Sequence, residues 1–193
     1  MTIPHRGWTT HDTYYITAST IQKKRLLQSD LMAGLLLEVL YHYRREKKYL
    51  LHEFVVMPNH FHLILTPEVT LERALQFLKG GFSFRAGKEL RFSSEIWQTS
   101  FYDHRLRDAG EYLRARNYIH QNPVRAGLAK IAEEYPYSSA NPQWELDEVP
   151  QRLSRNFLRP RYSRPEAPSR PLRAGSAHPV GFGGRLAPGG AGL

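Results

Sequence analysis

The stretch YLLHEFVVMPNHFHLILT (residues 49–66) contains two short apolar runs that are separated by Met57, Pro58 and Asn59. Both runs are rich in valine, leucine and aromatic residues, and a Pro-Asn pair between such runs is a turn signal. The pattern predicts an antiparallel hairpin, with strands over 49–56 and 60–66. The two histidines of the second strand raise the question of function.

His60 and His62 stand two positions apart, and side chains in a strand alternate between the two faces of the sheet. One face therefore carries His60, His62 and Ile64, whereas the apolar side chains at positions 61, 63 and 65 form a core face. Two imidazoles at this spacing, about 7 Å apart along the backbone, could converge on one metal ion. They could equally be two strand histidines that face solvent, and the spacing alone leaves both readings open.

The segments around the hairpin predict the rest of the fold. TYYITAS (13–19) is typical of a strand, and residues 29–48 have apolar positions at helical spacing, with Ser29 or Asp30 placed to cap the start. TLERALQFLKG (70–80) predicts a short helix that stops at Gly80 and Gly81. EIWQTSFYDHRL (95–106) predicts a fourth strand, and EYLRARNYIHQ (111–121) a further helix. The order strand, helix, strand, strand, helix, strand predicts an α+β fold of the ferredoxin-like type, a split βαβ unit with an antiparallel sheet and one additional helix.

Composition divides the 193 residues into two parts. Residues 151–193 hold eight arginines, no lysine and one acidic residue, whereas residues 1–150 are nearly balanced, with 19 basic and 17 acidic residues. We expect one folded domain over 1–150 and a disordered tail rich in arginine, proline and glycine over 151–193. The tail adds affinity for nucleic acid or has no role.

The chain contains no cysteine, so a disulfide framework and a thiolate metal site are both excluded. Its longest apolar run is too short to span a bilayer, and the N-terminus lacks a signal-peptide pattern. We therefore expect a protein of the cytoplasm with no membrane partner. The net charge of +9 favours a polyanionic partner.

The helix at 111–121 places Tyr118 one turn from Arg114 and one turn from Asn122. If this helix lies across the face of His60 and His62, a phenol, two imidazoles and a carbonyl oxygen could meet around a divalent ion. A phenol is a weak nucleophile at neutral pH, and a cation on a scissile phosphate would assist its attack. The chain has no G-x-x-x-x-G-K-[ST] loop, so this chemistry would not use ATP through such a loop.

The segments VVMPNHFHLIL, WQTSFYDHRLRD and YIHQNPVRAGL together resemble the single-tyrosine (HUH) transposases of small insertion sequences, in particular the REP-associated tyrosine transposases. The resemblance runs from about Tyr14 to Ala140. It implies a ferredoxin-like nuclease domain that cuts single-stranded DNA at short palindromic repeats that fold into hairpins. It also implies that His60 and His62 hold Mg²⁺ or Mn²⁺, that Asn122 is the third ligand, and that Tyr118 forms a 5′-phosphotyrosine intermediate. Relatives include monomers and dimers, so self-association is compatible with the resemblance.

Several assignments have competitors. Tyr102 is the alternative nucleophile, and His120 and Gln121 are the alternative third ligands. Asn122 precedes Pro123 and could instead cap a new turn. The basic residues that could contact phosphates, or be ordinary solvated charges, are Lys79, Arg85, Arg105, Arg107 and Arg114.

Trp97 and Phe101 are either core residues or platforms for stacking bases. The alternative function is a non-catalytic module that binds single-stranded nucleic acid on the same scaffold, with a regulatory use.

Overall fold

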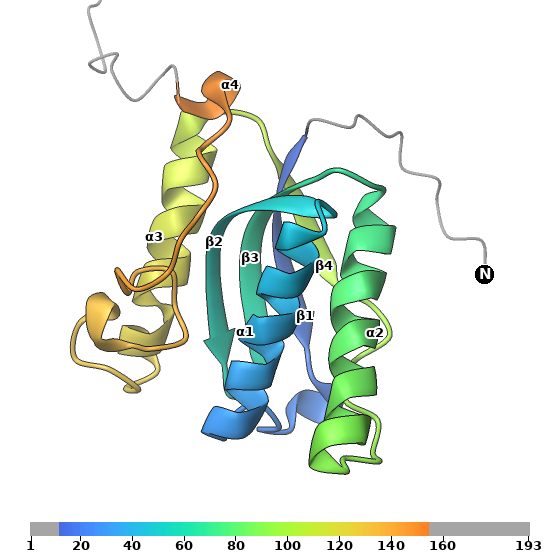
Figure 1. Ribbon diagram of the computed structural model, residues 1–193. Helices are drawn as coiled ribbons and strands as arrows, with labels where there is room; N and C mark the ends of the chain where they lie inside the picture. The colour runs from blue at the N-terminus through green and yellow to red at the C-terminus, as the bar shows by residue number, and fades with distance from the viewer. Residues whose placement is uncertain (1–11, 155–193) are drawn as a thin grey trace, which may run out of the picture. The chain divides into compact units, whose positions relative to one another are not determined.

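The computed structural model describes residues 12–154, which form a four-stranded antiparallel sheet with helices on both faces (Figure 1). The strand order is β2-β3-β1-β4. Strand β3 lies between β1 and β2 and is antiparallel to both, so β1 and β2 are the two parallel strands of a split βαβ unit. This is the predicted ferredoxin-like arrangement, and the α+β fold class is confirmed.

The main elements follow the predicted order. They are β1 (Thr13–Ser19), α1 (Asp30–Arg45), β2 (Tyr49–Met57), β3 (His60–Pro67), α2 (Leu71–Leu90), β4 (Tyr102–Leu106) and α3 (Ala109–Arg125). Two 3₁₀ turns, Ile21–Lys23 and Ala132–Glu134, and the short helix α4 (Gln151–Ser154) complete the described chain. Ser29 caps α1 by accepting a hydrogen bond from the Met32 amide, as its position before the apolar repeat predicts.

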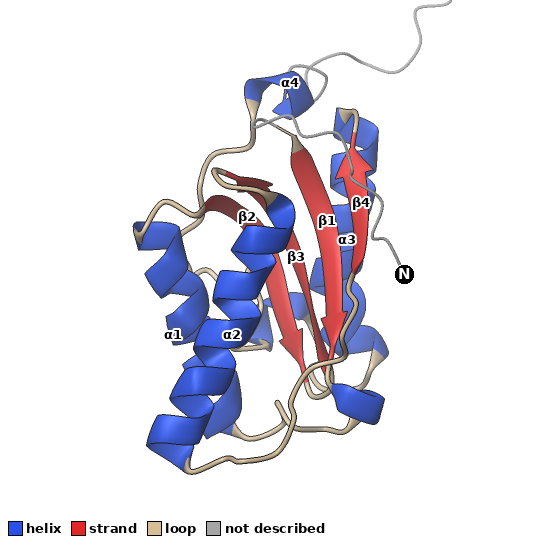
Figure 2. Cartoon of the chain, turned by 90° about the vertical axis from the view of Figure 1, so that its right-hand side faces the viewer, coloured by secondary structure: helices blue, strands red, loops and turns tan. Residues whose placement is uncertain are grey.

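Helices α1 and α2 cover one face of the sheet, and α3 covers the other (Figures 1 and 2). The larger core lies under α1 and α2 and includes Phe61, Leu63 and Leu65 of β3. A smaller core joins Ile64 of β3 to Tyr112 and Ile119 of α3. The alternation along β3 therefore sends its leucines to one layer and its histidines to the layer of α3.

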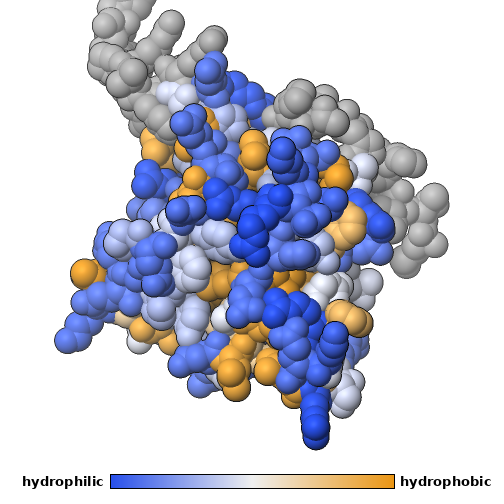
Figure 3. All heavy atoms as spheres, in the orientation of Figure 1, coloured by the Kyte–Doolittle hydropathy of each residue, from blue (hydrophilic) through white to orange (hydrophobic). Residues whose placement is uncertain are grey.

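The outward surface of α1 and α2 is largely hydrophilic with scattered apolar patches (Figure 3). In the part of the chain that the structure describes, no helix has both the length and the apolar character that a bilayer crossing requires. The two helices are therefore amphipathic covers of the sheet.

Helix α2 does not stop at Gly80 and Gly81, as the sequence indicated, but continues to Leu90. The glycine at position 81 has a packing role, because a Cβ built there would lie 2.6 Å from Cε2 of Tyr43 on α1. Gly81 is therefore the point where the Tyr43 ring approaches the backbone of α2 closely, and not a helix end.

The fourth strand is shorter than the predicted 95–106. Only Tyr102–Leu106 pair with β1, whereas residues 95–101 form a loop that touches the sheet through an isolated bridge between Thr20 and Trp97. Trp97 is buried against Phe61 and Phe82. The apolar pattern of this segment thus reflects burial of a loop.

Helix α3 extends past the predicted 121 to Arg125 and contains Pro123 in its last turn. At the end of the described chain, α4 lies within the segment that the composition assigned to the tail, and its Leu153 is buried in the smaller core. The predicted disorder of the rest of the tail lies outside the described residues.

Candidate active site

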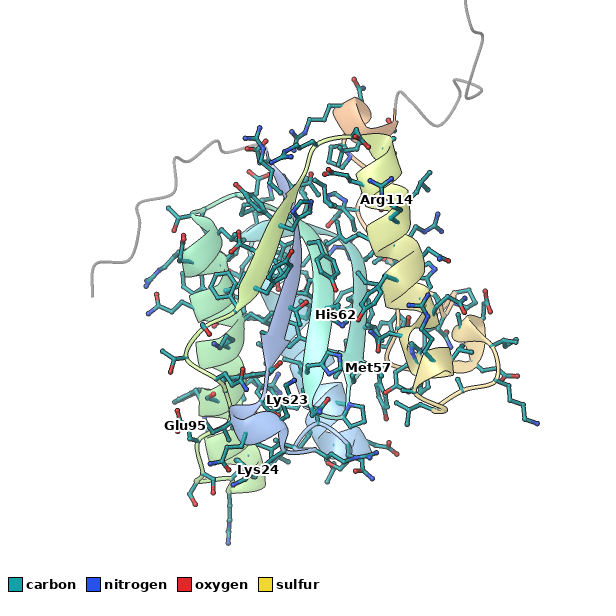
Figure 4. The ribbon with its side chains drawn as sticks, turned by 180° about the vertical axis from the view of Figure 1, so that it is seen from behind. Lys23, Lys24, Met57, His62, Glu95 and Arg114 are labelled. Atoms are coloured by element: carbon teal, nitrogen blue, oxygen red, sulfur yellow. The ribbon has the colours of Figure 1, made fainter. Side chains whose placement is uncertain are left out.

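The candidate site lies where β3 faces α3. His62 projects from β3, and Tyr118 projects from α3, with ring centroids 5.3 Å apart and an interplanar angle of 79°. The rings of His60 and His62 lie 4.7 Å apart. Figure 4 shows His62 on the sheet beside α3, the helix that also carries Arg114. The fold therefore brings together the two histidines and the tyrosine that the sequence singled out.

The imidazole of His62 is held at one nitrogen and left unpaired at the other. Its Nδ1 lies 2.8 Å from the hydroxyl of Tyr15 and 2.8 Å from the hydroxyl of Thr17, both on β1. Its Nε2 is buried and has no hydrogen-bond partner. Burial, and secondarily the neighbouring His60, lowers the pKa of His62 to about 3, so the ring is neutral at physiological pH.

His60 is held in a similar way by the turn that precedes it. Its Nδ1 lies 2.7 Å from Oδ1 of Asn59, whose amide nitrogen donates to the carbonyl oxygen of Lys23. Because that donation fixes the orientation of the Asn59 amide, Nδ1 of His60 is the donor and Nε2 keeps its lone pair. Burial, followed by the charge of Lys23, lowers the pKa of His60 and favours the neutral ring.

These donors fit a divalent cation. Neutral imidazole nitrogens are ligands for transition metals, and a buried nitrogen without a partner is a position that an ion would satisfy. Among residues 12–154 no cluster of three histidine, aspartate or glutamate side chains is suited to a metal, so a third protein ligand would come from another residue type. Asn122 lines a cavity of about 220 Å³ together with His60 and Asn59. Asn122 therefore lies beside His60, whose ring is next to that of His62.

His120, the alternative third ligand, is engaged elsewhere. Its Nε2 lies 2.8 Å from Oε2 of the buried carboxylate of Glu53, which also pairs with Arg116 and accepts from Ser139. This network ties α3 to β2 and to the segment after α3. Gln121 is half-buried. The cavity beside His60 therefore favours Asn122 over His120.

Tyr118 is 41% exposed, so its phenol is accessible to a substrate while one ring edge rests on the site. Its ring contacts both His62 and Tyr15, and the guanidinium of Arg125 lies over it, 5.6 Å from the ring centroid. Tyr102, the alternative nucleophile, is 59% exposed on β4 and packs its edge against Tyr15. Of the two phenols, Tyr118 is the one with a ring contact to His62.

The five predicted phosphate contacts lie in different places. Arg114 lines a second cavity, of about 350 Å³, together with Tyr118 and Tyr102. Lys79 and Arg85 lie on α2, across the sheet from α3. Lys79 donates to the carbonyl oxygen of Gln98, and burial lowers its pKa, whereas Arg85 pairs with Glu38 and Glu89.

Arg105 and Arg107 lie at the end of β4. Arg105 pairs with Asp12 and stands opposite Tyr14 in the β1–β4 register, on the face away from α3. The backbone amide of Arg107 donates to Glu111. Of the five basic residues, Arg114 is thus the one that shares a cavity with Tyr118. Trp97 belongs to the core, and Phe101 lines a separate cavity with Lys79.

The residues that sequence reasoning missed are those that hold the histidines. They are Tyr15, Thr17 and Asn59, together with Arg125 over the Tyr118 ring. Alternation along the first strand places Tyr15 and Thr17 on one face, which is a usable signal. Their position opposite His62 depends on the pairing of β1 with β3, in which Thr17 faces His62.

Comparisons with known proteins identify the family of the chain. The family model described as "Transposase IS200 like" matches residues 9–122. A Haemophilus influenzae protein named as a candidate REP-associated tyrosine transposase is 32% identical over 96 residues, which cover 44% of this chain and 54% of that protein. The REP-associated tyrosine transposase of Escherichia coli K12 is 29% identical over 99 residues, which cover 50% of this chain and 57% of that protein. The chain thus spans about half the length of these relatives.

A solved structure of a REP-associated tyrosine transposase bound to a REP hairpin is similar in fold. Its TM-score is 0.58 at 24% sequence identity, and the match covers 78% of this chain and 92% of that chain. The likeness supports the arrangement of sheet and helices. Because the family model covers more than half of the residues, the chain belongs to the family of IS200-like transposases.

Proposed function

We propose that this protein cuts and rejoins single-stranded DNA, with Tyr118 as the nucleophile and a divalent cation held by His60, His62 and Asn122. The observation that carries the proposal is the buried, unpartnered Nε2 of His62 on a ring that contacts the exposed phenol of Tyr118. A divalent cation at this nitrogen would lie next to the nucleophile. Neither feature is needed for sheet packing.

In the proposed step the Tyr118 oxygen attacks the scissile phosphorus and loses its proton. A new bond forms between phosphorus and the tyrosine oxygen, and the bond between phosphorus and the 3′-oxygen breaks. The 3′-oxygen takes up a proton and leaves as a free hydroxyl, while the 5′ end stays on the protein as phosphotyrosine. A bound Mg²⁺ or Mn²⁺ would polarise the phosphate and offset the developing negative charge. Attack by a 3′-hydroxyl on the phosphotyrosine reverses the step and joins two strands.

The surroundings of Tyr118 support a strand of nucleic acid as the substrate. Tyr118 lines one cavity with Tyr102 and Arg114, and Asn122, one turn further along α3, lines the other cavity with His60. The guanidinium groups of Arg114 and Arg125 supply positive charge beside the phenol of Tyr118. We propose hairpin-forming repeats as the target, because the structural relative was solved with a REP hairpin.

A non-catalytic binding module is the alternative. Such a module would use the same positive charge and the same cavities. It would have no use for a buried imidazole nitrogen that faces no partner, because burying a polar atom without a hydrogen bond costs free energy. The geometry therefore favours the enzyme.

The test is covalent attachment. A hairpin oligonucleotide labelled on the 3′ side of the scissile phosphate is incubated with the protein and Mn²⁺, and the products are separated under denaturing conditions. We expect labelled protein with wild type, none with Tyr118→Phe, and attachment retained with Tyr102→Phe. Tyr118→Phe should still bind the hairpin, because the substitution leaves the charge unchanged. Undiminished attachment in Tyr118→Phe would refute the assignment.

A further inference from the structure

Two hydroxyl groups of β1 converge on the same nitrogen of His62. The Tyr15 and Thr17 oxygens each lie 2.8 Å from Nδ1, and the Thr17 hydroxyl lies 3.4 Å from the Tyr15 hydroxyl and donates toward it. The Tyr15 ring stacks on the imidazole, with centroids 5.5 Å apart and an interplanar angle of 19°. This pairing restrains both the tilt and the rotation of the His62 ring.

The arrangement selects between the two neutral forms of the imidazole. If Nδ1 carries the proton, it donates to the hydroxyl oxygens, and Nε2 keeps a lone pair for an ion. If Nε2 carries the proton, a buried N–H is left without an acceptor, because Nε2 has no partner in the described structure. The hydroxyls of Tyr15 and Thr17 can accept a hydrogen bond from Nδ1–H, whereas an Nε2–H would have no acceptor, so these contacts favour the form that can bind a cation.

Tyr15 also contacts the nucleophile. Its ring centroid lies 6.3 Å from that of Tyr118, with the rings nearly perpendicular at 86°. One side chain therefore stacks on the imidazole of His62 and supports the phenol of Tyr118. This connects the two halves of the site through β1, a strand that supplies neither the nucleophile nor a ligand.

On the basis of the proposed function, we infer that Tyr15 and Thr17 are positioning residues that hold His62 in the Nδ1–H form, so that Nε2 faces a bound cation. Asn59 does the same for His60 through its side-chain oxygen. The inference differs from the proposed function because it concerns how the ligand is prepared, and it has its own measurable consequences.

The experiment measures Mn²⁺ binding to the full-length protein without DNA, by electron paramagnetic resonance of the free ion. The variants are Tyr15→Phe, Thr17→Val and the double variant, which remove the hydroxyls and retain most of the side-chain volume. Hydrogen-bond partners of metal-binding histidines typically change affinity by about 10- to 100-fold, so we expect a loss of about tenfold for each single variant. Thr17→Ser should restore the affinity, because it keeps a hydroxyl on β1.

Tyr14→Phe is the matched control. Tyr14 precedes Tyr15 on β1, and its side chain packs toward the core under α1 and α2. This variant removes a tyrosine hydroxyl from the same strand but from the opposite face, and it should leave Mn²⁺ affinity unchanged. Thermal unfolding of every variant identifies any loss of affinity that comes from unfolding.

The second readout is the tautomer of His62 in the metal-free protein, from long-range ¹H–¹⁵N correlation of the ring nitrogens. We expect the Nδ1–H form in wild type and a loss of that preference in the double variant. Unchanged affinity and an unchanged tautomer in the double variant would overturn the inference. Retained Mn²⁺ binding in His62→Ala would instead refute the metal site of the proposed function, so the two failures are distinguishable.

Discussion

The imidazole ring of His62 and the phenol ring of Tyr118 lie 5.3 Å apart and nearly perpendicular, although one residue belongs to β3 and the other to α3. The contact exists because α3 packs on the sheet face opposite α1 and α2, with Tyr112 and Ile119 buried against that face. Tyr118 precedes Ile119 and is thus placed at the edge of the packing surface, partly exposed. The packing that holds α3 against the sheet therefore also places the Tyr118 phenol beside the two histidines.

The side-chain oxygen of Asn122 should act as the third ligand. Substitutions at position 122 test this role. We expect Asn122→Ala to weaken Mn²⁺ binding by about tenfold or more, since the variant removes one of three protein ligands. Asn122→Asp should lower the Mg²⁺ concentration needed for attachment, because a carboxylate suits Mg²⁺ better than an amide oxygen does. Metal titrations of binding and of attachment measure both effects.

Asn117 offers the control for these variants, because it is an exposed asparagine on the same helix. Asn117→Ala should bind Mn²⁺ as wild type does. If Asn122→Ala also matches wild type while His60→Ala loses the ion, the third ligand is a different residue, and Gln121 is the next to test.

Acid should destabilise the fold in part through His52. This histidine is buried on β2, with Nδ1 3.2 Å from the carbonyl oxygen of Asp147 and Nε2 2.9 Å from the hydroxyl of Thr66. Burial lowers the pKa of His52 below its usual 6.5. The unfolded chain therefore binds a proton more readily than the folded chain as the pH falls below that value.

The free energy of unfolding should then decrease with falling pH, by up to about 1.4 kcal/mol per pH unit for this one group. His52→Gln removes the titration and should flatten the dependence between pH 7 and pH 5, as measured by urea unfolding. An identical slope in wild type and His52→Gln would contradict the prediction.

Most of the fold could be predicted from the sequence, because the patterns that define its strands and helices lie within short segments. The alternation of residues 60–66 set the two faces of β3, and the spacing in residues 29–48 set the buried side of α1. The C-terminal end of α2 could not be predicted, because Gly81 resembles a helix stop in the sequence and only the structure shows its packing against Tyr43. The contacts of Tyr15 and Thr17 with His62 depend on strand register, which connects residues far apart in the chain.

The candidate site could also be predicted in part. Residue types and spacing selected His60, His62, Tyr118 and Asn122, which the structure places together. Basic residues were harder to rank, because charge alone does not say which face a side chain occupies. Arg85, for example, pairs with carboxylates on α1 and α2.

The arginine-rich tail gives a prediction for binding. Deleting residues 155–193 removes seven of the eight arginines of the tail and keeps α4, whose Leu153 is buried and whose Arg152 pairs with Asp12. For every phosphate that the shortened protein no longer neutralises, the slope of log affinity against log salt should flatten by roughly 0.7 on single strands. Hairpin preference should survive, because the arginines of the tail supply charge, whereas the folded domain would recognise the shape of the hairpin.

Binding of the full-length and shortened proteins to a hairpin and to a scrambled strand, each at several salt concentrations, separates the two contributions. A slope that does not change means that the tail takes no part in binding. Loss of hairpin preference with retained affinity would mean that recognition lies in the tail.

The central claim is tested most directly by locating the covalent bond. Trypsin cleaves after Arg116 and Arg125, so Tyr118 is the one tyrosine of peptide 117–125, whereas Tyr102 falls in peptide 92–105. The adduct formed with a hairpin oligonucleotide and Mn²⁺ is trimmed with nuclease, digested and analysed by mass spectrometry. We predict a nucleotide phosphate on peptide 117–125 that is absent when EDTA is present. A phosphate on peptide 92–105, or strand cleavage with no modified peptide, would contradict the assignment of Tyr118 as the nucleophile.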